Sequence, residues 1–550
     1  MSAADAIAEG RTVLGIELGS TRIKACLVGE NPNDVLAVGS HEWQNELVDG
    51  VWTYSLDDVW AGLQSAYATL VADARARHGA ELTSVAAIGI SAMMHGYLAV
   101  DERDELLVPF RTWRNTSTAA AATELTELFG VNIPLRWSIA HLHQAVLDGE
   151  SHVADVRFIT TLAGYVHWRL TGERVLGVGD ASGMFPLGSA PISTAPVDAA
   201  GADYDNGMLA QYDALVGGSA LAMPLRRMLP SILPAGATAG TLTAEGAALL
   251  DPTGALQPGA VFCPPEGDAG TGMVATNAVA PATGNVSAGT SIFAMVVLAQ
   301  PLQRVHPELD IVATPAGHPV AMVHCNNGTS ELAAWVGVFR RFAELTGSPI
   351  DADEAYRLLL LEALDGAADA GGVLAYNQIA GEPIADLTEG RPIVVRTPAS
   401  ELSLANTMRA LVYGVFATLS LGMRTLHDEG VAIDLMQAHG GLFRTAGVAQ
   451  RLLAAALDAP VGVAESASEG GAWGIAVLAS FSAAGGGDLA AYLESRVFTD
   501  SSSTVMAPDP ADVAGFTAYL AQYEAGLEIQ RRAIDALPAA RSADHQGASS

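Results

Sequence analysis

The sequence is poor in cysteine and in long apolar runs, and each shortage excludes a class of protein. Cys26, Cys263 and Cys325 are its only cysteines and form no CxxC pair. A disulfide framework or a zinc site is therefore not expected, and a reducing compartment is. The N-terminus has no basic stretch followed by an apolar one, and apolar runs such as 292–299 cover less than half a membrane span. We expect a soluble, cytoplasmic protein.

Positive charge is also scarce. Lys and Arg total 28 against 60 for Asp and Glu, which gives a net charge of −32. Such a surface repels nucleic acids and anionic membranes, so we expect neither as a partner. An anionic ligand would need local devices, such as backbone amides, helix N-termini or a metal ion. Lysine occurs once, at Lys24, which is either the survivor of a bias towards arginine or a functional residue.

The chain is rich in hydrophobic residues, which occur in patterns typical of strands and helices. Half of its 550 residues are hydrophobic, which excludes a disordered chain. The length fits three or four domain-sized units, or about two large ones. Apolar runs predict strands at 13–18, 23–28, 35–43 and 85–92, and a Ser55 cap predicts a helix to about residue 77. Alternating strands and helices predict an α/β fold.

The second half repeats the opening of the first. A Gly-Thr-Ser turn at 289–291 lies between apolar segments, as a Gly-Ser-Thr turn does at 19–21. The repeat predicts two related domains, each beginning with a β-hairpin. The remaining patterns predict helices and strands in alternation at 404–429, 433–438, 445–458, 461–464 and 469–482. We interpret 191–218 as a surface insertion and the polar tail after 541 as frayed.

The two turns suggest a phosphate site. Backbone amides and hydroxyls in such turns can surround a phosphate without a basic surface. The six residues concerned are Gly19, Ser20, Thr21, Gly289, Thr290 and Ser291. Two turns facing each other would hold a polyphosphate such as ATP from both sides, and Lys24 would add a point charge. Glu17, just before the first turn, is either a solvent-facing strand residue or an acid that holds Mg²⁺ through water.

Asp268 is the candidate proton acceptor. It lies in the small-residue segment 264–278, just before a predicted helix. An Asp at this place is usually a helix N-cap. The alternative is a carboxylate that accepts the proton of a substrate hydroxyl as its oxygen attacks a γ-phosphoryl group.

Three further segments carry candidate binding residues. Met94 and His95 follow a predicted strand, where α/β proteins often bind ligands, although a single His is more often structural. Trp113 between polar neighbours suits a polyol, or is a core residue. Gly440 and Gly441 between a strand and a helix either let a flat adenine lie on the backbone or form an ordinary turn.

Together these segments resemble the FGGY family of carbohydrate kinases, over roughly residues 13–485. The strings that carry the resemblance, in the order of the family, are VLGIELGSTRIKACLV, ISAMMHG, RTWRN, YVHWRLTGERVLGVGDASGMF, GDAGTGMVATNA, VSAGTS, HGGLFRTAGVAQRLLAAALDAPV and SASEGGAWGIAVLA.

The resemblance implies two RNase-H-like domains of the actin, hexokinase and sugar-kinase superfamily, at 1–278 and 279–550, flanking a central cleft that holds ATP and a sugar. Asp268 then corresponds to the general base. The sugar-facing residues would be Met94, His95, Trp113, Arg114, Asn115 and Asp268. The ATP-facing residues would be the two turns with Lys24, Gly440 and Gly441, and the Mg²⁺ ligands would be Glu17 and Asp268.

Three positions depart from the family pattern. Glu17 stands where the family usually has Asp, which bears on the geometry of the Mg²⁺ site. Met93 stands where Gln usually precedes Met-His, and Asn115, beside Arg114, stands where the family has a sugar-binding Asp, which bears on the substrate. We expect an ATP- and Mg²⁺-dependent kinase for a terminal hydroxyl of a ketopentose. D-xylulose is the first choice because of the Asp-Ala-Ser-Gly stretch at 180–183. The alternatives are L-ribulose, L-xylulose or gluconate kinases, or a non-catalytic sugar-binding regulator; a chaperone-like or actin-like ATPase is a third reading that the Trp113 segment argues against. A homodimer is left open.

Overall fold

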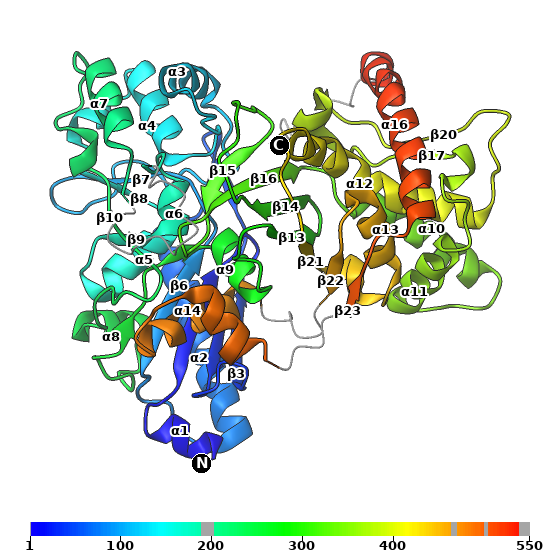
Figure 1. Cartoon of the computed structure of the whole chain (residues 1–550). Helices are drawn as coiled ribbons and strands as arrows, with labels where there is room; N and C mark the ends of the chain where they lie inside the picture. Colours follow the sequence, from blue (N-terminus) through cyan, green and yellow to red (C-terminus); the bar gives the residue numbers. More distant parts are fainter. Residues whose placement is uncertain (1, 189–202, 464–469, 500–503, 538–550) are drawn as a thin grey trace, which may run out of the picture. The chain divides into compact units, whose positions relative to one another are not determined.

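The computed structural model describes residues 2–188, 203–463, 470–499 and 504–537 (Figure 1). The chain forms two compact units. Unit 1 is Met1–Gly284, Val296–Met322 and Glu465–Ser502, and unit 2 is Asn285–Met295, Val323–Ala464 and Ser503–Ser550. The units therefore differ from the single boundary expected at 278, because two later segments return to unit 1. The expected tail after 541 lies outside the described residues.

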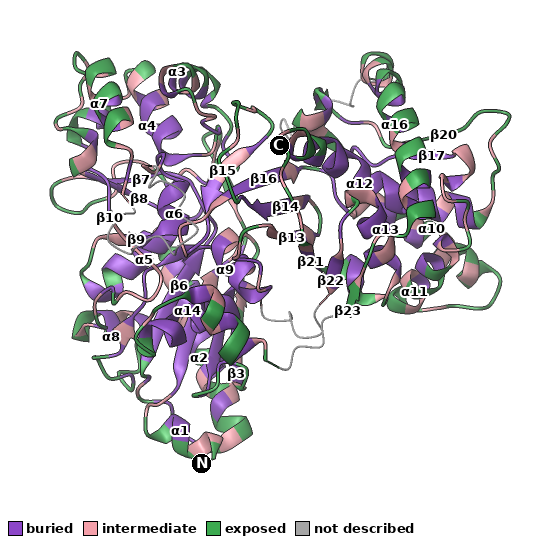
Figure 2. Ribbon diagram, viewed as in Figure 1, coloured by how far each residue is buried: buried purple, intermediate pink, exposed green. Residues whose placement is uncertain are grey.

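Unit 1 is built on a mixed sheet with the strand order β11-β6-β1-β2-β3, to which β12 adds beside β6. The strands are β1 Val13–Leu18, β2 Arg22–Val28, β3 Val35–Glu42, β6 Ala87–Ala92, β11 Val261–Phe262 and β12 Glu266–Gly267. The predicted hairpin and third strand are thus confirmed, and most strand residues are buried (Figure 2).

The strand register brings the site segments to one edge of this sheet. β1 and β6 are parallel with Leu18 opposite Ala92, and β12 is parallel to β6 with Gly267 opposite Ala92. The C-terminal ends of these three parallel strands therefore lie together at one edge of the sheet, where α/β proteins often bind ligands. The segments that follow them are the first turn, the loop after Ala92 and Asp268.

Two glycines of the sheet allow helices to pack closely against it. A Cβ on Gly15 would lie 2.1 Å from the Ala472 carbonyl oxygen, so α14 (Gly470–Ala483) packs directly on β1. A Cβ on Gly39 would lie 2.1 Å from the Ala66 carbonyl oxygen, so α2 (Leu56–His78) packs directly on β3. The register places Gly15 and Gly39 on opposite faces of the pleat. The two helices therefore cover opposite faces.

The rest of unit 1 is mainly short helices with small two-stranded sheets. The helices are α1 Ala3–Ala8, α3 Ala119–Phe129, α4 Ser138–Leu147, α5 Leu162–Thr171, α6 Val178–Ser182, α7 Asn206–Leu215, α8 Ala244–Leu250, α9 Asp268–Ala275 and α15 Leu489–Tyr492. The two-stranded sheets are formed by β4 Glu46–Val48, β5 Val51–Thr53, β7 Leu98–Val100, β8 Phe158–Thr160, β9 Val175–Gly177 and β10 Ser231–Leu233. β15 Asp310–Ala313 pairs instead with β16 Pro319–Cys325. Residues 203–218 are more than the surface insertion we predicted, because α7 buries Tyr212 completely; residues 191–202 lie outside the described chain.

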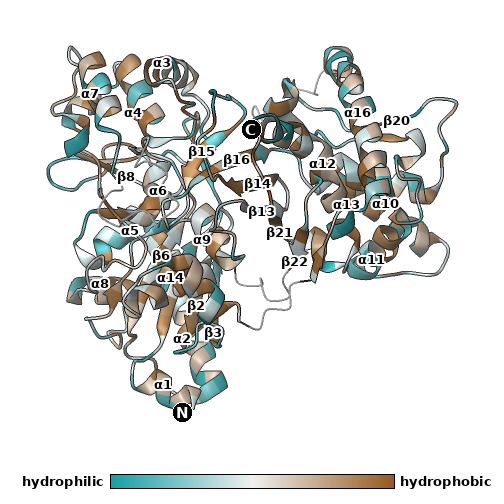
Figure 3. Ribbon diagram, in the orientation of Figure 1, coloured by the Kyte–Doolittle hydropathy of each residue, from teal (hydrophilic) through white to brown (hydrophobic). Residues whose placement is uncertain are grey.

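Unit 2 contains a sheet with neighbouring strands in the order β14-β13-β21-β22-β23. The strands of this sheet are β13 Thr283–Ala288, β14 Ile292–Val297, β21 Leu435–His439, β22 Val461–Val463 and β23 Thr504–Met506. Two small two-stranded sheets are formed by β17 Leu374–Tyr376 with β20 Ile393–Val395 and by β18 Ala380–Glu382 with β19 Leu387–Glu389. Figure 3 shows the strongly apolar β14 in brown. Its helices are α10 Ser330–Leu345, α11 Ala352–Ala363, α12 Leu404–Asp428, α13 Val448–Leu457 and α16 Pro510–Ala536. The predicted helices at 404–429, 445–458 and 469–482 are confirmed within a few residues.

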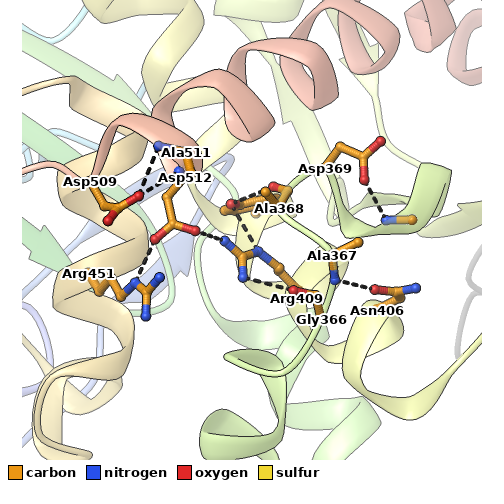
Figure 4. Close-up of polar contacts among 12 residues, drawn as sticks. Gly366, Ala367, Ala368, Asp369, Asn406, Arg409, Arg451, Asp509, Ala511 and Asp512 are labelled. Carbon is orange, nitrogen blue, oxygen red and sulfur yellow. Dashed lines mark hydrogen bonds and ion pairs between the residues drawn. The ribbon is translucent and has the colours of Figure 1, made fainter.

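Helix α12 is the core helix of unit 2. Among the described residues it is the one helix long and apolar enough to cross a membrane, yet 89% of that window is buried inside the protein. A buried Arg409 on α12 is paired with Asp512 of α16, and Asp512 also pairs with Arg451 of α13 (Figure 4). These ion pairs tie the C-terminal helix to the core.

Candidate active site

Asp268 is the first residue of α9 rather than its N-cap, which is Gly267. Its Oδ1 accepts hydrogen bonds from the amides of Met94 (3.1 Å) and Ala269 (3.0 Å). Its Oδ2 accepts none from any other residue that the structure describes. Burial raises the pKa of Asp268, while the amides of Met94 and Ala269 and the charge of Arg136 oppose the rise. One oxygen is thus fixed in place and the other is available to a ligand.

Glu17 and Lys24 lie opposite each other on β1 and β2. Burial raises the pKa of Glu17 to about 7; the charge of Lys24 lowers that pKa and the charge of Asp268 raises it further. Asp268 is therefore close enough for its charge to act on Glu17. A cation placed near both would favour their ionised forms.

The loop after β6 is held by its neighbours on every side. The Met94 amide bonds Asp268, and the His95 Nδ1 lies 3.2 Å from the Gly183 carbonyl oxygen. The Gly96 amide donates to the Arg136 carbonyl, and Ser138 Oγ donates to the Gly96 carbonyl at 2.6 Å. His95 has a φ of 68°, in the left-handed region, although it carries a side chain. Such backbone strain persists only where the surroundings enforce it.

A buried carboxyl pair, Asp180 and Glu266, lies behind this loop. Glu266 accepts hydrogen bonds from the amides of Gly179 (3.3 Å) and Asp180 (2.9 Å). Asp180 accepts one from the Thr161 hydroxyl at 2.6 Å. Burial raises the pKa of Asp180 to about 7 and that of Glu266 to about 8. Neither acid was among the predicted site residues, although Glu266 stands only two residues before Asp268.

The segment predicted to face the sugar is largely engaged in packing. Trp113 packs against the hydrophobic core. The Arg114 guanidinium carbon lies 3.9 Å from the centre of the Trp52 ring. The Asn115 amide makes three backbone hydrogen bonds, two with Trp52 and one with Thr112, of 2.8 to 3.0 Å. Asn115 thus links its own segment to β5. Arg114 is exposed, and its side chain is accessible to a ligand.

In the first turn the carbonyl groups are hydrogen-bonded within the protein, whereas the amide and hydroxyl donors are not. The Gly19 carbonyl accepts from the Trp43 ring nitrogen (2.7 Å), and the Ser20 carbonyl accepts from the Tyr54 hydroxyl (2.6 Å). The two rings stack with centroids 4.2 Å apart. The amides and hydroxyls of Ser20 and Thr21 donate to no residue in the described part of the chain. Donors without partners are what an anion requires.

The second turn belongs to unit 2 and has a comparable construction. The Gly289 carbonyl accepts from the amide (2.9 Å) and the hydroxyl (3.0 Å) of Thr329, and the Thr290 carbonyl accepts from the Gly328 amide. Gly440 has a φ of 116°, and a Cβ there would lie 2.2 Å from the Ala288 carbonyl oxygen. Gly440 therefore lies directly beside this turn.

Unit 1 thus collects the first turn, Glu17, Lys24, Met94, His95 and Asp268 at one sheet edge. Unit 2 brings Gly289, Thr290, Ser291 and Gly440 together. The Arg136–Asp310 ion pair lies near this edge, since Arg136 acts on the pKa of Asp268. Its partners are 174 residues apart, so no local sequence signal could have found it.

The donor set suits a magnesium ion. Mg²⁺ prefers oxygen ligands and usually takes one or two carboxylates together with substrate phosphates. Glu17 and Asp268 are two carboxylates whose charges interact. Among the described residues, no group of three or more His, Cys, Asp or Glu side chains is arranged to hold a metal ion.

Two family models match the chain. The N-terminal domain of the FGGY family of carbohydrate kinases matches residues 12–253, and the C-terminal domain matches residues 284–483. A search of curated proteins finds no match.

Solved structures with the same fold include several sugar kinases. A "xyloylose kinase" from Brucella ovis is 20% identical with a TM-score of 0.72, over 94% of this chain and 98% of that one. The xylulose kinase from Rhodospirillum rubrum is 18% identical with a TM-score of 0.73, over 94% and 99%. The gluconate kinase from Lactobacillus acidophilus is also 18% identical with a TM-score of 0.73, over 96% and 99%. At these identities the likeness shows the two-domain kinase fold. The chain belongs to the FGGY family of carbohydrate kinases and is a phosphotransferase.

Proposed function

We propose that the protein transfers the γ-phosphoryl group of ATP to a terminal hydroxyl of a ketopentose, with D-xylulose as the preferred acceptor. The observation that carries the mechanism is the asymmetric environment of Asp268. Two amides fix Oδ1, which leaves Oδ2 as the proton acceptor. The raised pKa of Asp268 makes it a better base than an exposed carboxylate.

In the proposed reaction the substrate hydroxyl donates its proton to Asp268 Oδ2 as its oxygen attacks the γ-phosphorus. The new O–P bond forms, the P–O bond to the β-phosphate breaks, and ADP leaves with the bond's electron pair. Glu17 and Asp268 would hold Mg²⁺, which supplies charge neutralisation at the phosphates. The amides of Ser20, Thr21, Thr290 and Ser291 would orient the phosphate chain, with Lys24 as the nearby cation.

The loop bearing Met94 and His95 would form one wall of the sugar site. Its hydrogen bonds to Asp268, Gly183 and Arg136 fix it relative to the base. A fixed geometry between acceptor hydroxyl and base is worth much of the rate enhancement in phosphoryl transfer. Trp113 and Asn115 would support this wall from behind.

A sugar acid such as gluconate is the second candidate. Arg114 is exposed and stacks on Trp52, where it could meet a carboxylate. The gluconate kinase from Lactobacillus acidophilus has the same identity and TM-score to this chain as the xylulose kinase from Rhodospirillum rubrum. L-ribulose and L-xylulose remain further ketose candidates. A regulator without turnover would not need a base, so the hydrogen-bonded Asp268 carboxylate argues against that alternative.

ADP release should be measured with D-xylulose, L-xylulose, L-ribulose and gluconate, with Asp268→Asn as the blank. The proposal predicts the highest kcat/KM for D-xylulose. Preference for gluconate, lost in Arg114→Ala, would select the sugar-acid alternative. If no acceptor stimulates ADP release above the blank, the proposed function is wrong.

A further inference from the structure

Gly471, in the first turn of α14, occupies a place where the structure leaves no room for a side chain. A Cβ on Gly471 would lie 2.3 Å from Oε1 and 2.8 Å from Cδ of Glu17. The next atom, Thr271 Oγ1, would be 2.9 Å away. Real Cβ atoms essentially never approach non-bonded heavy atoms within 3.0 Å. The Glu17 carboxylate therefore rests directly on the backbone of α14.

Backbone conformation does not explain this glycine. Gly470 has a φ of 55°, whereas the φ of Gly471 lies outside the positive region that favours glycine. Inside a helix, alanine is the better residue wherever space allows it. Gly471 instead leaves space for its neighbours, and the two nearest atoms belong to Glu17.

Glu17 also lies beside a cation. Glu17 and Lys24 are opposite each other in the register of β1 and β2. A Cβ on Gly470 would lie 3.9 Å from Lys24 Nζ, so the cation reaches the same part of α14. The carboxylate of Glu17 is thus placed against α14 and beside Lys24.

We infer that Gly471 is a positioning residue for Glu17: its missing side chain lets the long acid place its carboxylate against α14, next to Lys24. Asp at position 17, shorter by one methylene, would not need this space. The part of the inference that concerns catalysis rests on the proposed function, whereas the size match between residues 17 and 471 does not.

A rescue experiment tests the size match. Gly471→Ala, Glu17→Asp and the double variant should be compared by thermal unfolding and by ADP release over a range of Mg²⁺ concentrations. Gly337→Ala is the control, because Gly337 also lies in a helix, α10, but a Cβ added there would have no heavy atom within 4 Å.

Gly471→Ala is expected to lower Tm by about 5 °C and turnover by roughly 10- to 100-fold, with a higher Mg²⁺ concentration for half-maximal rate. The double variant should recover most of the Tm loss and come within about twofold of Glu17→Asp in turnover. The control should keep the wild-type Mg²⁺ dependence. A Mg²⁺ shift distinguishes positioning of Glu17 from a general loss of stability.

Strictly additive losses in the double variant would overturn the inference, as would a Gly471→Ala protein with wild-type Tm and rate. If Gly471→Ala does not fold, the test becomes whether Glu17→Asp restores a folded protein. If the wild type phosphorylates no sugar, the proposed function fails, and the Tm comparison still decides whether Gly471 accommodates Glu17.

Discussion

Removing the carboxylate of Asp512 should destabilise the protein far more than removing a similar carboxylate on the same helix. Asp512 pairs with Arg409, whose side chain is only 2% exposed, and Asp512 itself is 4% exposed. In Asp512→Ala, Arg409 would keep the Gly366 carbonyl and the Tyr413 hydroxyl as neutral partners. No charge would then balance it in the core.

The expected loss is about 3–5 kcal/mol, the usual result of leaving one member of a buried ion pair without its partner. Glu524→Ala is the matched control. Glu524 also lies on α16 and also pairs with an arginine of α12, Arg424, but the two side chains are 46% and 48% exposed. Solvent screens that pair, so its loss should cost less than about 1 kcal/mol.

Urea unfolding of the full chain, combined with hydrogen exchange of α12 and α16 amides, measures both variants. Hydrogen exchange locates the loss in unit 2, which a global transition of a two-unit protein does not do. Equal losses for Asp512→Ala and Glu524→Ala would refute the reasoning, since burial is the difference on which it depends.

Three further predictions concern the site. Burial raises the pKa of Asp180 to about 7 from 3.8. Its contribution to the free energy of unfolding is therefore full below about pH 4 and is lost as pH rises towards 7, a change of up to about 4 kcal/mol. Asp180→Asn should remove this part of the pH dependence, measured by urea unfolding between pH 4 and 8. Lys24→Met should raise KM for ATP more than KM for the sugar, and an unchanged KM for ATP would remove Lys24 from the phosphate site. Asn115→Ala should lower stability by about 1–3 kcal/mol, because it strands the Trp52 backbone, while the order of sugar preference stays as in the wild type; a reordered preference would show that Asn115 contacts the sugar.

The local elements of the fold were predictable because their signals are local. Alternating apolar residues around Gly19 predicted β1 and β2, and the Ser55 cap predicted the start of α2, where its hydroxyl accepts from the Asp58 amide at 3.0 Å. The return of α14 to unit 1 could not be predicted in this way. It depends on the close contact between Gly15 and the Ala472 backbone, two positions that no periodicity connects.

The candidate site shows the same division. Asp268 and the two turns carry recognisable sequence patterns, and the structure brings the first turn and Asp268 to one sheet edge. Asn115 was expected to face the sugar, and its side chain bonds backbone atoms of Thr112 and of Trp52, which is 63 residues away. Asp180 and Glu266 form a pair only because α6 and β12 meet in the fold. A single sequence gives the residue types but not these long-range contacts.

The central claim is that Asp268 accepts the proton of the sugar hydroxyl. The most direct measurement is the turnover of Asp268→Asn with saturating ATP and sugar, alongside its affinity for ATP. The amide keeps an acceptor oxygen for the Met94 and Ala269 amides but is not a base, so we predict a loss of roughly 10²- to 10⁴-fold in kcat with near-normal ATP binding. Turnover within a few-fold of the wild type would contradict this account.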